Sequence, residues 1–358
     1  MTQKPRILVL SYVPAYNRQG RDLAECLYEN GYDVSLVQMN VATDKTKKVF
    51  GVKCIPPKGI FHKAIMLWNI ARFVQKSLLL PKDIVVVVGK PALGVGGLFS
   101  LVFRSKLVWY SLEFSRLRCL DRFVYQHFVK GYIDVEENRR DAIFREYGKK
   151  DVSLVCHNMP RSRKTLPSGG KLRAYLSAKY GVGKDCKIAI YAGSYQKYAC
   201  LDKIVEASSH FPENVKLVLM TYGLPERLAS ASPNCIVIPP VNGEDFYDWL
   251  ADADCALLPY ESETDFNVMN CSPQKLFDCY VAGVPFVASD RPLVRRVLEA
   301  DICAGELCDF TSGEDIVGAV GKIINRKTIV SAGMRRLYLE RFNYGAMSGR
   351  IADLFGQI

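Results

Sequence analysis

A segment in the second half of the chain has residue types and a spacing that could bind a phosphate. It reads SPQKLFDCYVAGVP over residues 272–285, and its proline and glycine predict a helix from Pro273 to Gly283. The free backbone amides and the positive dipole end of a helix start favour an anion there. Lys275 falls in the first turn, and Asp278 follows on the same face, where a carboxylate could accept hydrogen bonds from sugar hydroxyls. An ordinary exposed lysine and aspartate would have the same spacing.

Apolar runs on either side of this helix indicate the sheet that would position it. The runs 255–258 and 286–288 predict two strands, so strand, polar loop, helix and strand form one βαβ unit. The chain opens in the same way, with an apolar run at 6–12, a helix that ends near Gly31, and a second run at 33–38. This alternation is typical of a parallel sheet with helices on both faces.

The length of 358 residues exceeds what one hydrophobic core usually serves, so two domains are expected. Further strands are predicted at 84–88, 107–110, 131–135, 153–156, from 187, at 216–220 and at 235–238. We predict a first doubly wound domain over 1–160, a linker with a docking helix over 161–185, a second doubly wound domain over 186–335, and a C-terminal helical segment over 336–358.

Composition argues against several classes of protein. With 49% hydrophobic and 11% aromatic residues, the chain is not expected to be disordered. Its 12 cysteines lack paired C-x-x-C spacing and only 4 histidines accompany them, so no zinc site is predicted. The absence of a signal peptide indicates reduced thiols in a cytoplasmic compartment. Residues 84–103 approach the length and apolarity of a membrane span, but Lys90 and Pro91 favour a strand, a glycine-rich turn and a helix from about Val95.

Charge is distributed unevenly along the chain, whose net charge is +11. Residues 1–180 contain 31 Lys and Arg against 14 Asp and Glu, a balance of +17, whereas the remainder has 17 against 23, a balance of −6. A basic half can attract nucleic acid, anionic lipid headgroups or a pyrophosphate-bearing substrate, although a solvated basic surface needs no partner. Residues 61–80 predict an amphipathic helix that could lie on a membrane or pack within the domain. Its polar stripe consists of His62, Asn69, Arg72 and Lys76.

The run SPQKLFDCYVAGVPFVASD, residues 272–290, resembles the donor-site segment of retaining GT-B glycosyltransferases of family 4, also called glycosyl transferases group 1. In that family a carboxylate follows an S-P-x-K-L-F run and precedes a small-residue stretch that ends in G-x-P. Similar blocks occur as WYSLEF at 109–114, IDVEENRRDAIFREYG at 133–148 and CHNMP at 156–160. The resemblance implies two Rossmann-like doubly wound parallel-sheet domains that face each other across a cleft, with the last helix crossing back to the first domain.

The same resemblance implies which residues serve the site. The donor nucleotide sugar would meet Gly193, Ser194, Lys197, Tyr222, Gly223, Val241, Tyr260, Cys271, Ser272, Pro273, Lys275 and Asp278. The acceptor side would include Tyr16, Gly20 and Glu113, and the catalytic residues would be Glu113, Asn270 and Lys275, without a metal. Of the family's two glutamates, which are separated by seven residues, the second position holds Asp278 and the first holds the neutral Asn270. The stereochemical outcome therefore stays open. Relatives have a histidine near the position of Leu112.

These observations predict a cytoplasmic glycosyltransferase of hexosyl type that uses a UDP- or GDP-linked sugar as co-substrate and needs no other cofactor. The expected acceptor is a saccharide, lipid-linked in the first hypothesis, in bacterial surface-polysaccharide biosynthesis, with peripheral association at the cytoplasmic membrane face. A nucleotide-sugar 2-epimerase of the same fold is the alternative enzyme. A non-catalytic protein that binds nucleic acid or another anionic surface would also explain the basic half, but no nucleic-acid motif is present and no nucleic-acid partner is expected.

Overall fold

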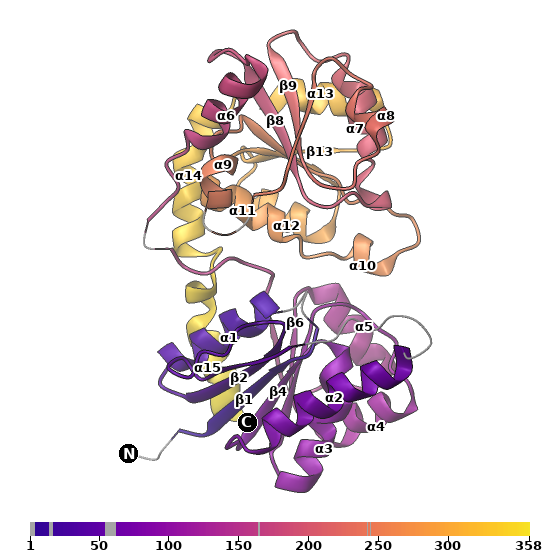
Figure 1. The fold of residues 1–358 in the computed structure, drawn as a ribbon, viewed down its shortest axis with the longest axis vertical. Coiled ribbons are helices and arrows are strands. Elements are labelled where there is room, and N and C mark those ends of the chain that lie inside the picture. The colour runs from indigo at the N-terminus through magenta and orange to yellow at the C-terminus, as the bar shows by residue number, and fades with distance from the viewer. Residues whose placement is uncertain (1–3, 14–16, 54–61, 164, 242, 244) are drawn as a thin grey trace. The chain divides into compact units, whose positions relative to one another are not determined.

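The structure, a computed structural model, describes residues 4–13, 17–53, 62–163, 165–241, 243 and 245–358. Tyr16, which was assigned to the acceptor side, lies outside the described residues. The chain forms two compact units (Figure 1). Unit 1 comprises Met1–Asn158 together with Met347–Ile358, and unit 2 comprises Met159–Ala346.

Unit 1 is built on a parallel sheet of seven strands in the order β3-β2-β1-β4-β5-β6-β7. The strands are β1 (Arg6–Ser11), β2 (Asp33–Met39), β3 (Val49–Val52), β4 (Ile84–Val88), β5 (Lys106–Ser111), β6 (Val129–Asp134) and β7 (Val152–Val155). The central strand β4 is buried along its whole length, as expected for a parallel sheet covered on both faces.

The helices of unit 1 cover both faces of this sheet. They are α1 (Asn17–Glu29), α2 (His62–Leu78), the short 3₁₀ helix η3 (Lys90–Ala92), α3 (Leu93–Phe103), α4 (Cys119–His127), α5 (Glu137–Tyr147) and α15 (Ser348–Gln357). Helices α2 to α5 share one core with the sheet, which includes Phe73, Phe99, Tyr125 and Ile143 of these helices together with Trp109 of β5. Helix α15 packs against α1, and the Asn30 amide donates a 2.6 Å hydrogen bond to Ser348 Oγ.

Unit 2 repeats this architecture with six parallel strands in the order β10-β9-β8-β11-β12-β13. The strands are β8 (Lys187–Ala192), β9 (Val215–Met220), β10 (Cys235–Ile238), β11 (Cys255–Leu258), β12 (Phe286–Ser289) and β13 (Gly305–Cys308). The helices are α6 (Lys171–Tyr180), η4 (Lys197–Ala199), α7 (Leu201–Ser208), α8 (Glu226–Ala229), α9 (Asp245–Leu250), α10 (Phe266–Met269), α11 (Gln274–Ala282), α12 (Pro292–Ala300), α13 (Gly313–Ile323), α14 (Lys327–Glu340) and η5 (Tyr344–Met347).

Two wholly parallel sheets with interleaved helices confirm the predicted doubly wound α/β class. Residues 84–103 fold as predicted, into a buried strand, a short turn and a helix. In the described part of the chain, no helix is long and apolar enough to cross a membrane.

Several local predictions differ from the structure. Helix α11 begins at Gln274, because Pro273 is its extended N-cap with ψ of 118°, and it ends at Gly283 in the left-handed conformation. The expected loop before it contains helix α10. The C-terminal helical segment is interrupted, since α14 ends at Glu340 and α15 begins at Ser348.

The segment 161–185, which was expected to be a linker, lies within unit 2. Its helix α6 contacts the segment between α9 and β11. Arg173 Nη2 of α6 forms a 2.7 Å ion pair with Asp254, which directly precedes β11. The carboxylate of Asp252 also accepts a 2.6 Å hydrogen bond from the Gly170 amide just before α6.

Candidate functional site

Lys275 lies where the strand order of the unit 2 sheet reverses, between β8 and β11. Ligands of open parallel sheets bind outside the carboxyl ends of the strands at such a reversal. Gly193 follows β8 directly, and a Cβ built on it would lie only 2.3 Å from Lys275 Nζ. The missing side chain of Gly193 therefore allows the lysine to extend across the end of the strand.

The Lys275 ammonium rests on aromatic rings. Its Nζ lies 4.3 Å from the ring centroid of Tyr191 and 5.6 Å from that of Tyr260. Burial lowers the pKa of this lysine to about 8, although the nearby charge of Asp278 acts to raise it. Among the described residues, none of the hydrogen bonds or ion pairs neutralises the ammonium. The site thus holds a cation on π faces that an anionic ligand could pair with.

Asp278 sits one turn further along α11 and is only 3% exposed. Its carboxylate accepts a 2.9 Å hydrogen bond from the Tyr247 hydroxyl of α9 and a 3.3 Å hydrogen bond from the Gln274 amide. These contacts tie the carboxylate to the neighbouring helix α9 and to the first turn of its own helix. To bind sugar hydroxyls as predicted, the Asp278 carboxylate must accept a further hydrogen bond beside that from Tyr247 or lose the hydrogen bond from Tyr247.

The predicted catalytic Asn270 is the C-cap residue that directly follows the short helix α10, and it is 8% exposed. Its side-chain amide donates a 3.1 Å hydrogen bond to the carbonyl of Phe266 in the same helix. Cys271, Ser272 and Pro273, which link it to α11, are also buried. The segment that precedes the lysine is thus held tightly, and its asparagine contributes a neutral dipole.

Other predicted donor residues lie at the same edge of the unit 2 sheet. The carbonyl of Ser194 accepts a 2.7 Å hydrogen bond from the Tyr191 hydroxyl, which orients the ring beneath Lys275. Lys197 is exposed at the start of η4. After β9 and β10 come the exposed Tyr222, the left-handed Gly223 with φ of 76°, and the half-buried Val241. The fold brings these strand ends together, while their ligands remain a proposal.

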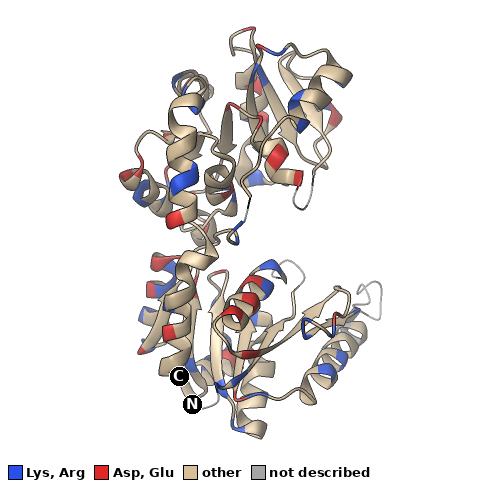
Figure 2. Cartoon of the chain, turned by 90° about the vertical axis from the view of Figure 1, so that its left-hand side faces the viewer, with Lys and Arg blue, Asp and Glu red and all other residues tan. Residues whose placement is uncertain are grey.

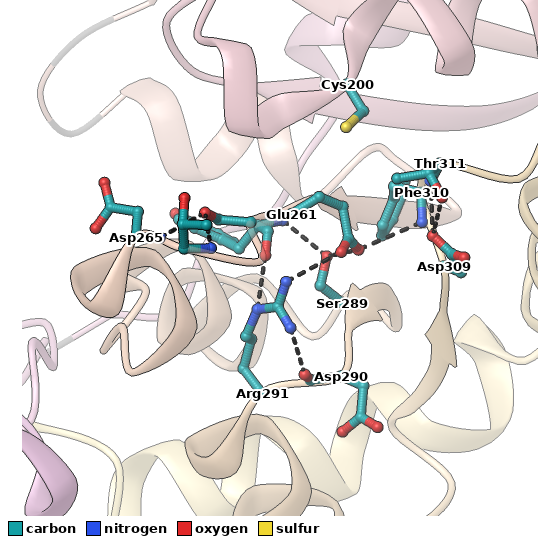
Figure 3. A network of polar contacts seen from close by, with 12 residues as sticks. Cys200, Glu261, Asp265, Ser289, Asp290, Arg291, Asp309, Phe310 and Thr311 are labelled. Atoms are coloured by element: carbon teal, nitrogen blue, oxygen red, sulfur yellow. Dashed lines mark hydrogen bonds and ion pairs between the residues drawn. The ribbon is translucent and has the colours of Figure 1, made fainter.

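A polar network beside the site was not predicted from the sequence (Figure 3). The carboxylate of Glu261, just after β11, accepts hydrogen bonds from the Ser289 hydroxyl at 2.6 Å and the Phe310 amide at 3.3 Å. It also pairs with Arg291 Nη2 at 3.0 Å. Ser289 is the last residue of β12, Arg291 lies two residues after it, and Phe310 lies two residues after β13, so one carboxylate joins three neighbouring strand ends. We call Glu261, Ser289 and Arg291 the strand-end clasp.

The strand-end clasp holds the backbone of Tyr260. The Tyr260 amide donates to Ser289 Oγ at 2.8 Å, and Arg291 Nε donates to the Tyr260 carbonyl at 2.6 Å. The fixed ring stacks on Tyr198, with 5.4 Å between centroids and an interplanar angle of 10°. Because the same ring faces Lys275, the strand-end clasp sets part of the environment of the cation. Polar residues directly after apolar strands were the sequence signal for this network.

In unit 1, two of the predicted acceptor residues are described, Glu113 after strand β5 and Gly20 in helix α1. Glu113 is exposed two residues after β5, and its carbonyl accepts a 3.2 Å hydrogen bond from the Ser111 hydroxyl. The sequence predicts that Gly20 lies in a loop between the first strand and the first helix. It lies instead in the first turn of α1, because this helix already begins at Asn17. A Cβ on Gly20 would lie 3.0 Å from that of Ser11, so the glycine permits close packing of helix on strand.

A buried carboxylate, Asp134, ends β6 beside β5 and was also not predicted. It accepts hydrogen bonds from the Tyr132 hydroxyl and from the amides of Val135 at 2.7 Å and Glu136 at 3.2 Å. Burial raises its pKa to about 7 despite these donors. Asp134 thus organises the turn into α5. Across the described residues, no group of three or more His, Cys, Asp or Glu side chains could hold a metal ion.

Comparison with known proteins supports the reading of the fold. No family model matches the chain. A D-inositol 3-phosphate glycosyltransferase from Xylanimonas cellulosilytica is 27% identical over 206 residues, which cover 54% of this chain and 47% of that protein. The chain thus matches about half the length of this curated relative.

Two solved structures extend the comparison to nearly the whole chain. HepE of Anabaena, in complex with UDP-glucose, superposes with a TM-score of 0.73 at 13% identity and covers 99% of this chain and 100% of its own. WaaG, a glycosyltransferase involved in lipopolysaccharide biosynthesis, gives a TM-score of 0.64 at 15% identity and covers 98% and 99% of the two chains. The chain has the GT-B fold and resembles glycosyltransferases of family 4.

Proposed function

We propose that the protein transfers a sugar from a UDP-sugar to a saccharide acceptor. The observation that carries this proposal is the Lys275 ammonium, which lies at the strand-order reversal of unit 2 and rests on two tyrosine rings without a neutralising partner among the described residues. HepE has been solved with UDP-glucose bound, and the inositol phosphate relative is a glycosyltransferase. The first supports a UDP-sugar as the donor, and the second supports glycosyl transfer as the reaction.

In the proposed reaction, the bond between the sugar and the diphosphate breaks while charge develops on the leaving phosphate. Lys275 and the free amides at the start of α11 would stabilise that charge, which is the largest expected contribution to catalysis. Lys197, at the end of the neighbouring strand β8, would add a second cation. We therefore propose that transfer needs no metal, and that chelation by EDTA leaves the rate unchanged. A requirement for Mg²⁺ or Mn²⁺ would contradict this part.

Stereochemistry is part of the proposal. Resemblance to a retaining family favours transfer with retention, in which the leaving phosphate oxygen accepts the acceptor's proton on the same face of the sugar. The neutral Asn270 can offer a dipole to the sugar but no compensating charge. Proton NMR of the first product formed distinguishes the outcomes, because retention keeps the anomeric configuration of the donor. An inverted product would assign the proton to a protein base, with Glu113 as the first candidate.

We further propose that the acceptor is lipid-linked, in a surface-polysaccharide pathway, and that the protein works at a membrane surface. The basic balance of +17 over residues 1–180 supports attraction to anionic lipid or to a pyrophosphate-linked acceptor. WaaG acts in lipopolysaccharide biosynthesis, which is consistent with an acceptor of this kind.

Thermal unfolding with UDP, GDP, CMP and their sugars tests the donor assignment. UDP and a UDP-sugar are expected to raise Tm, because a ligand that binds only the folded state stabilises it by about 2.7 kcal/mol at a hundredfold excess over Kd. The Lys275→Ala variant should fold and lose this response. If no nucleotide raises Tm, the donor site is refuted. Formation of an epimer from the donor without an acceptor would favour a 2-epimerase instead.

A further inference from the structure

Exposed apolar side chains gather on one part of unit 1. Of the 18 large hydrophobic residues that are exposed among the described ones, ten lie between residues 67 and 123. The other eight are spread over the rest of both units. Proteins that stay monomeric in water rarely expose a large contiguous apolar patch, so such a concentration marks an interaction surface.

Helix α3 is the centre of this surface. It contains no charged residue from Leu93 to Phe103, and its inner face packs on the sheet through Gly96 and Phe99. Its outer face exposes Leu98, Leu101 and Val102 by 47%, 66% and 59%. A helix that is apolar all round is normally buried in a core or in a bilayer. Within the described part of the chain, nothing covers the outer face of α3 at these three residues.

The neighbouring helices continue the apolar surface. Helix α4 lies directly against α3, because a Cβ on Gly97 would be 2.6 Å from the Val124 side chain. Lys82 connects the end of α2 to α3, since its ammonium binds the Leu78 carbonyl at 3.0 Å and lies 4.2 Å from the Phe103 ring centroid. We define the apolar ridge as Leu79, Leu98, Leu101, Val102, Leu120 and Phe123, all exposed. The apolar ridge thus runs from the turn after α2 to the helices α3 and α4, whose places in the fold are labelled in Figure 1.

Basic residues outnumber acidic ones in the part of the sequence that carries the apolar ridge. Residues 62–133 contain 11 Lys and Arg but only three Asp and Glu. Two of these acids are paired, Asp83 with Arg6 at 2.8 Å and Asp121 with Lys90 at 3.8 Å. Exposed arginines stand at the end of α3, at the start of α4 and within α4, namely Arg104, Arg118 and Arg122. The Lys and Arg positions of the chain are blue in Figure 2.

We propose that the apolar ridge docks on the surface of an anionic lipid bilayer. The apolar side chains would enter the boundary between headgroups and acyl chains, while the arginines meet lipid phosphates. An apolar patch in a segment with an excess of cations matches this surface, whereas an acidic protein partner would not need so many exposed apolar side chains. The inference deepens the proposed function and rests on it for its biological purpose, since a lipid-linked acceptor would be reached at that surface.

The surface differs from the one suggested by the sequence. The basic stripe of α2 pointed to that helix alone, yet Asn69 is buried and Arg72 donates a 3.1 Å hydrogen bond to the Lys53 carbonyl. Helix α3, which the sequence analysis did not connect with a membrane, exposes Leu101 by 66%, whereas the most exposed leucine of α2, Leu67, is exposed by 63%. The proposal therefore centres on α3 and α4.

Flotation with lipid vesicles tests this surface. The full chain is incubated with vesicles of phosphatidylcholine alone, or with one third phosphatidylglycerol, at low salt. We expect the wild type to float with the anionic vesicles, and Leu101→Gln with Phe123→Gln to reduce the bound fraction by at least about tenfold. Arg104→Gln with Arg122→Gln should reduce only the dependence on phosphatidylglycerol. The matched control is Ile329→Gln with Leu339→Gln, which removes equally exposed residues of α14 and should float like wild type.

Two results would overturn the proposal. One is a wild type that does not float with anionic vesicles, or floats equally well after the ridge substitutions. The other is a lipid-free dimer, seen by analytical ultracentrifugation, that the ridge substitutions dissociate, because the occupant would then be a second copy of the chain. UDP-induced thermal stabilisation is measured on every variant. A variant that keeps this response while losing vesicle binding separates the surface from the donor site, and absence of the response in the wild type refutes only the proposed function.

Discussion

The two units have similar sheet topologies, but the lysine near the reversal of the strand order has different surroundings in each unit. The strand order of the first sheet reverses between β1 and β4, and that of the second between β8 and β11. A lysine lies near the helix after β4 and another near the helix after β11, namely Lys90 before α3 and Lys275 in α11. Lys90 donates to the Arg116 carbonyl at 2.6 Å and pairs with Asp121 at 3.8 Å. Lys275 faces two aromatic rings instead. Similar folds therefore do not imply similar binding sites. The charge of Lys90 is already neutralised by Asp121, whereas the charge of Lys275 can pair with an anionic ligand.

The helices that follow these strands also differ. Seven of the nine residues of α11 are buried, whereas α3 exposes aliphatic side chains along its outer face. In unit 2, burial is used to lower the dielectric around a cation, which strengthens its pull on an anion. In unit 1, apolar residues are left at the surface at a cost in solubility. This division suggests that one unit recognises the small donor and the other recognises an extended surface.

The largest expected effect tests the two lysines against each other. Lys275→Ala should weaken UDP binding about 10- to 100-fold, because a charge-assisted hydrogen bond contributes about 1.5–3 kcal/mol. Lys90→Ala removes a cation that the protein already neutralises, so UDP affinity should stay within about twofold of wild type. Isothermal titration calorimetry measures both. Equal losses in the two variants would abolish the distinction between the units.

The second effect is the pH dependence of UDP affinity. The pKa of Lys275 is lowered from 10.5 to about 8, so its ammonium is charged below pH 8 and loses its proton above it. Affinity should therefore fall as pH rises, approaching about tenfold per pH unit well above the pKa. The free energy of unfolding without ligand should depend on pH in the opposite direction. Between pH 8 and 10.5 the folded state binds fewer protons at Lys275 than the unfolded state, so stability should rise with pH.

Lys275→Arg provides the control for that titration. Arginine stays protonated throughout this range, so any remaining affinity should not vary with pH. The groups around the ammonium are Tyr191, Tyr260 and Asp278, together with buried cysteines of the same segment. An equal fall of affinity in Lys275→Arg would assign the titration to one of those groups or to UDP itself.

Much of the fold was predictable because buried parallel strands have continuous apolar sequences. The bounds of β4, β10 and β11 match the apolar runs residue by residue. Strand β3 (Val49–Val52) was not predicted, because this edge strand is only partly buried and lacks such a run. The helix before the C-terminus was predicted as one segment, since the helical pattern continues across the break near Asn343, whose side chain binds the carbonyl of Tyr338.

The site was predictable only in its local part. Lys275 and the glycine that ends α11 belong to one motif, so the sequence indicated them. Glu261 of the strand-end clasp accepts hydrogen bonds from Ser289 and Phe310, which are 28 and 49 positions away and meet it only because β11, β12 and β13 are neighbours in the sheet. Nor does spacing show that Asp278 is buried against Tyr247. Polar partners distant in sequence are found only once the strand order is known.

A third, smaller effect probes the strand-end clasp. Glu261→Gln keeps the shape but removes the charge that Arg291 pairs with, so Tyr260 should be held less firmly and UDP binding should weaken about 3- to 10-fold. Tyr260→Phe keeps the ring over which Lys275 lies and should bind UDP nearly as wild type, whereas Tyr260→Leu removes the π face and should lose affinity. If Phe and Leu at this position behave alike, the ring has no role in positioning the cation.

The smallest expected effect on UDP binding comes from unit 1. Gly97→Ala places a Cβ 2.6 Å from a methyl group of Val124, whose β-branched side chain cannot rotate away easily. Overpacking usually costs about 1–3 kcal/mol, and the better helix propensity of alanine offsets about 1 kcal/mol of this. Denaturant unfolding should therefore show a modest loss, which Val124→Ala relieves in the double variant. UDP affinity should not change, because the contact lies in the core of unit 1. A loss of UDP affinity in Gly97→Ala would show that packing beneath the apolar ridge influences the donor site, and the two units could then no longer be treated as separate in function.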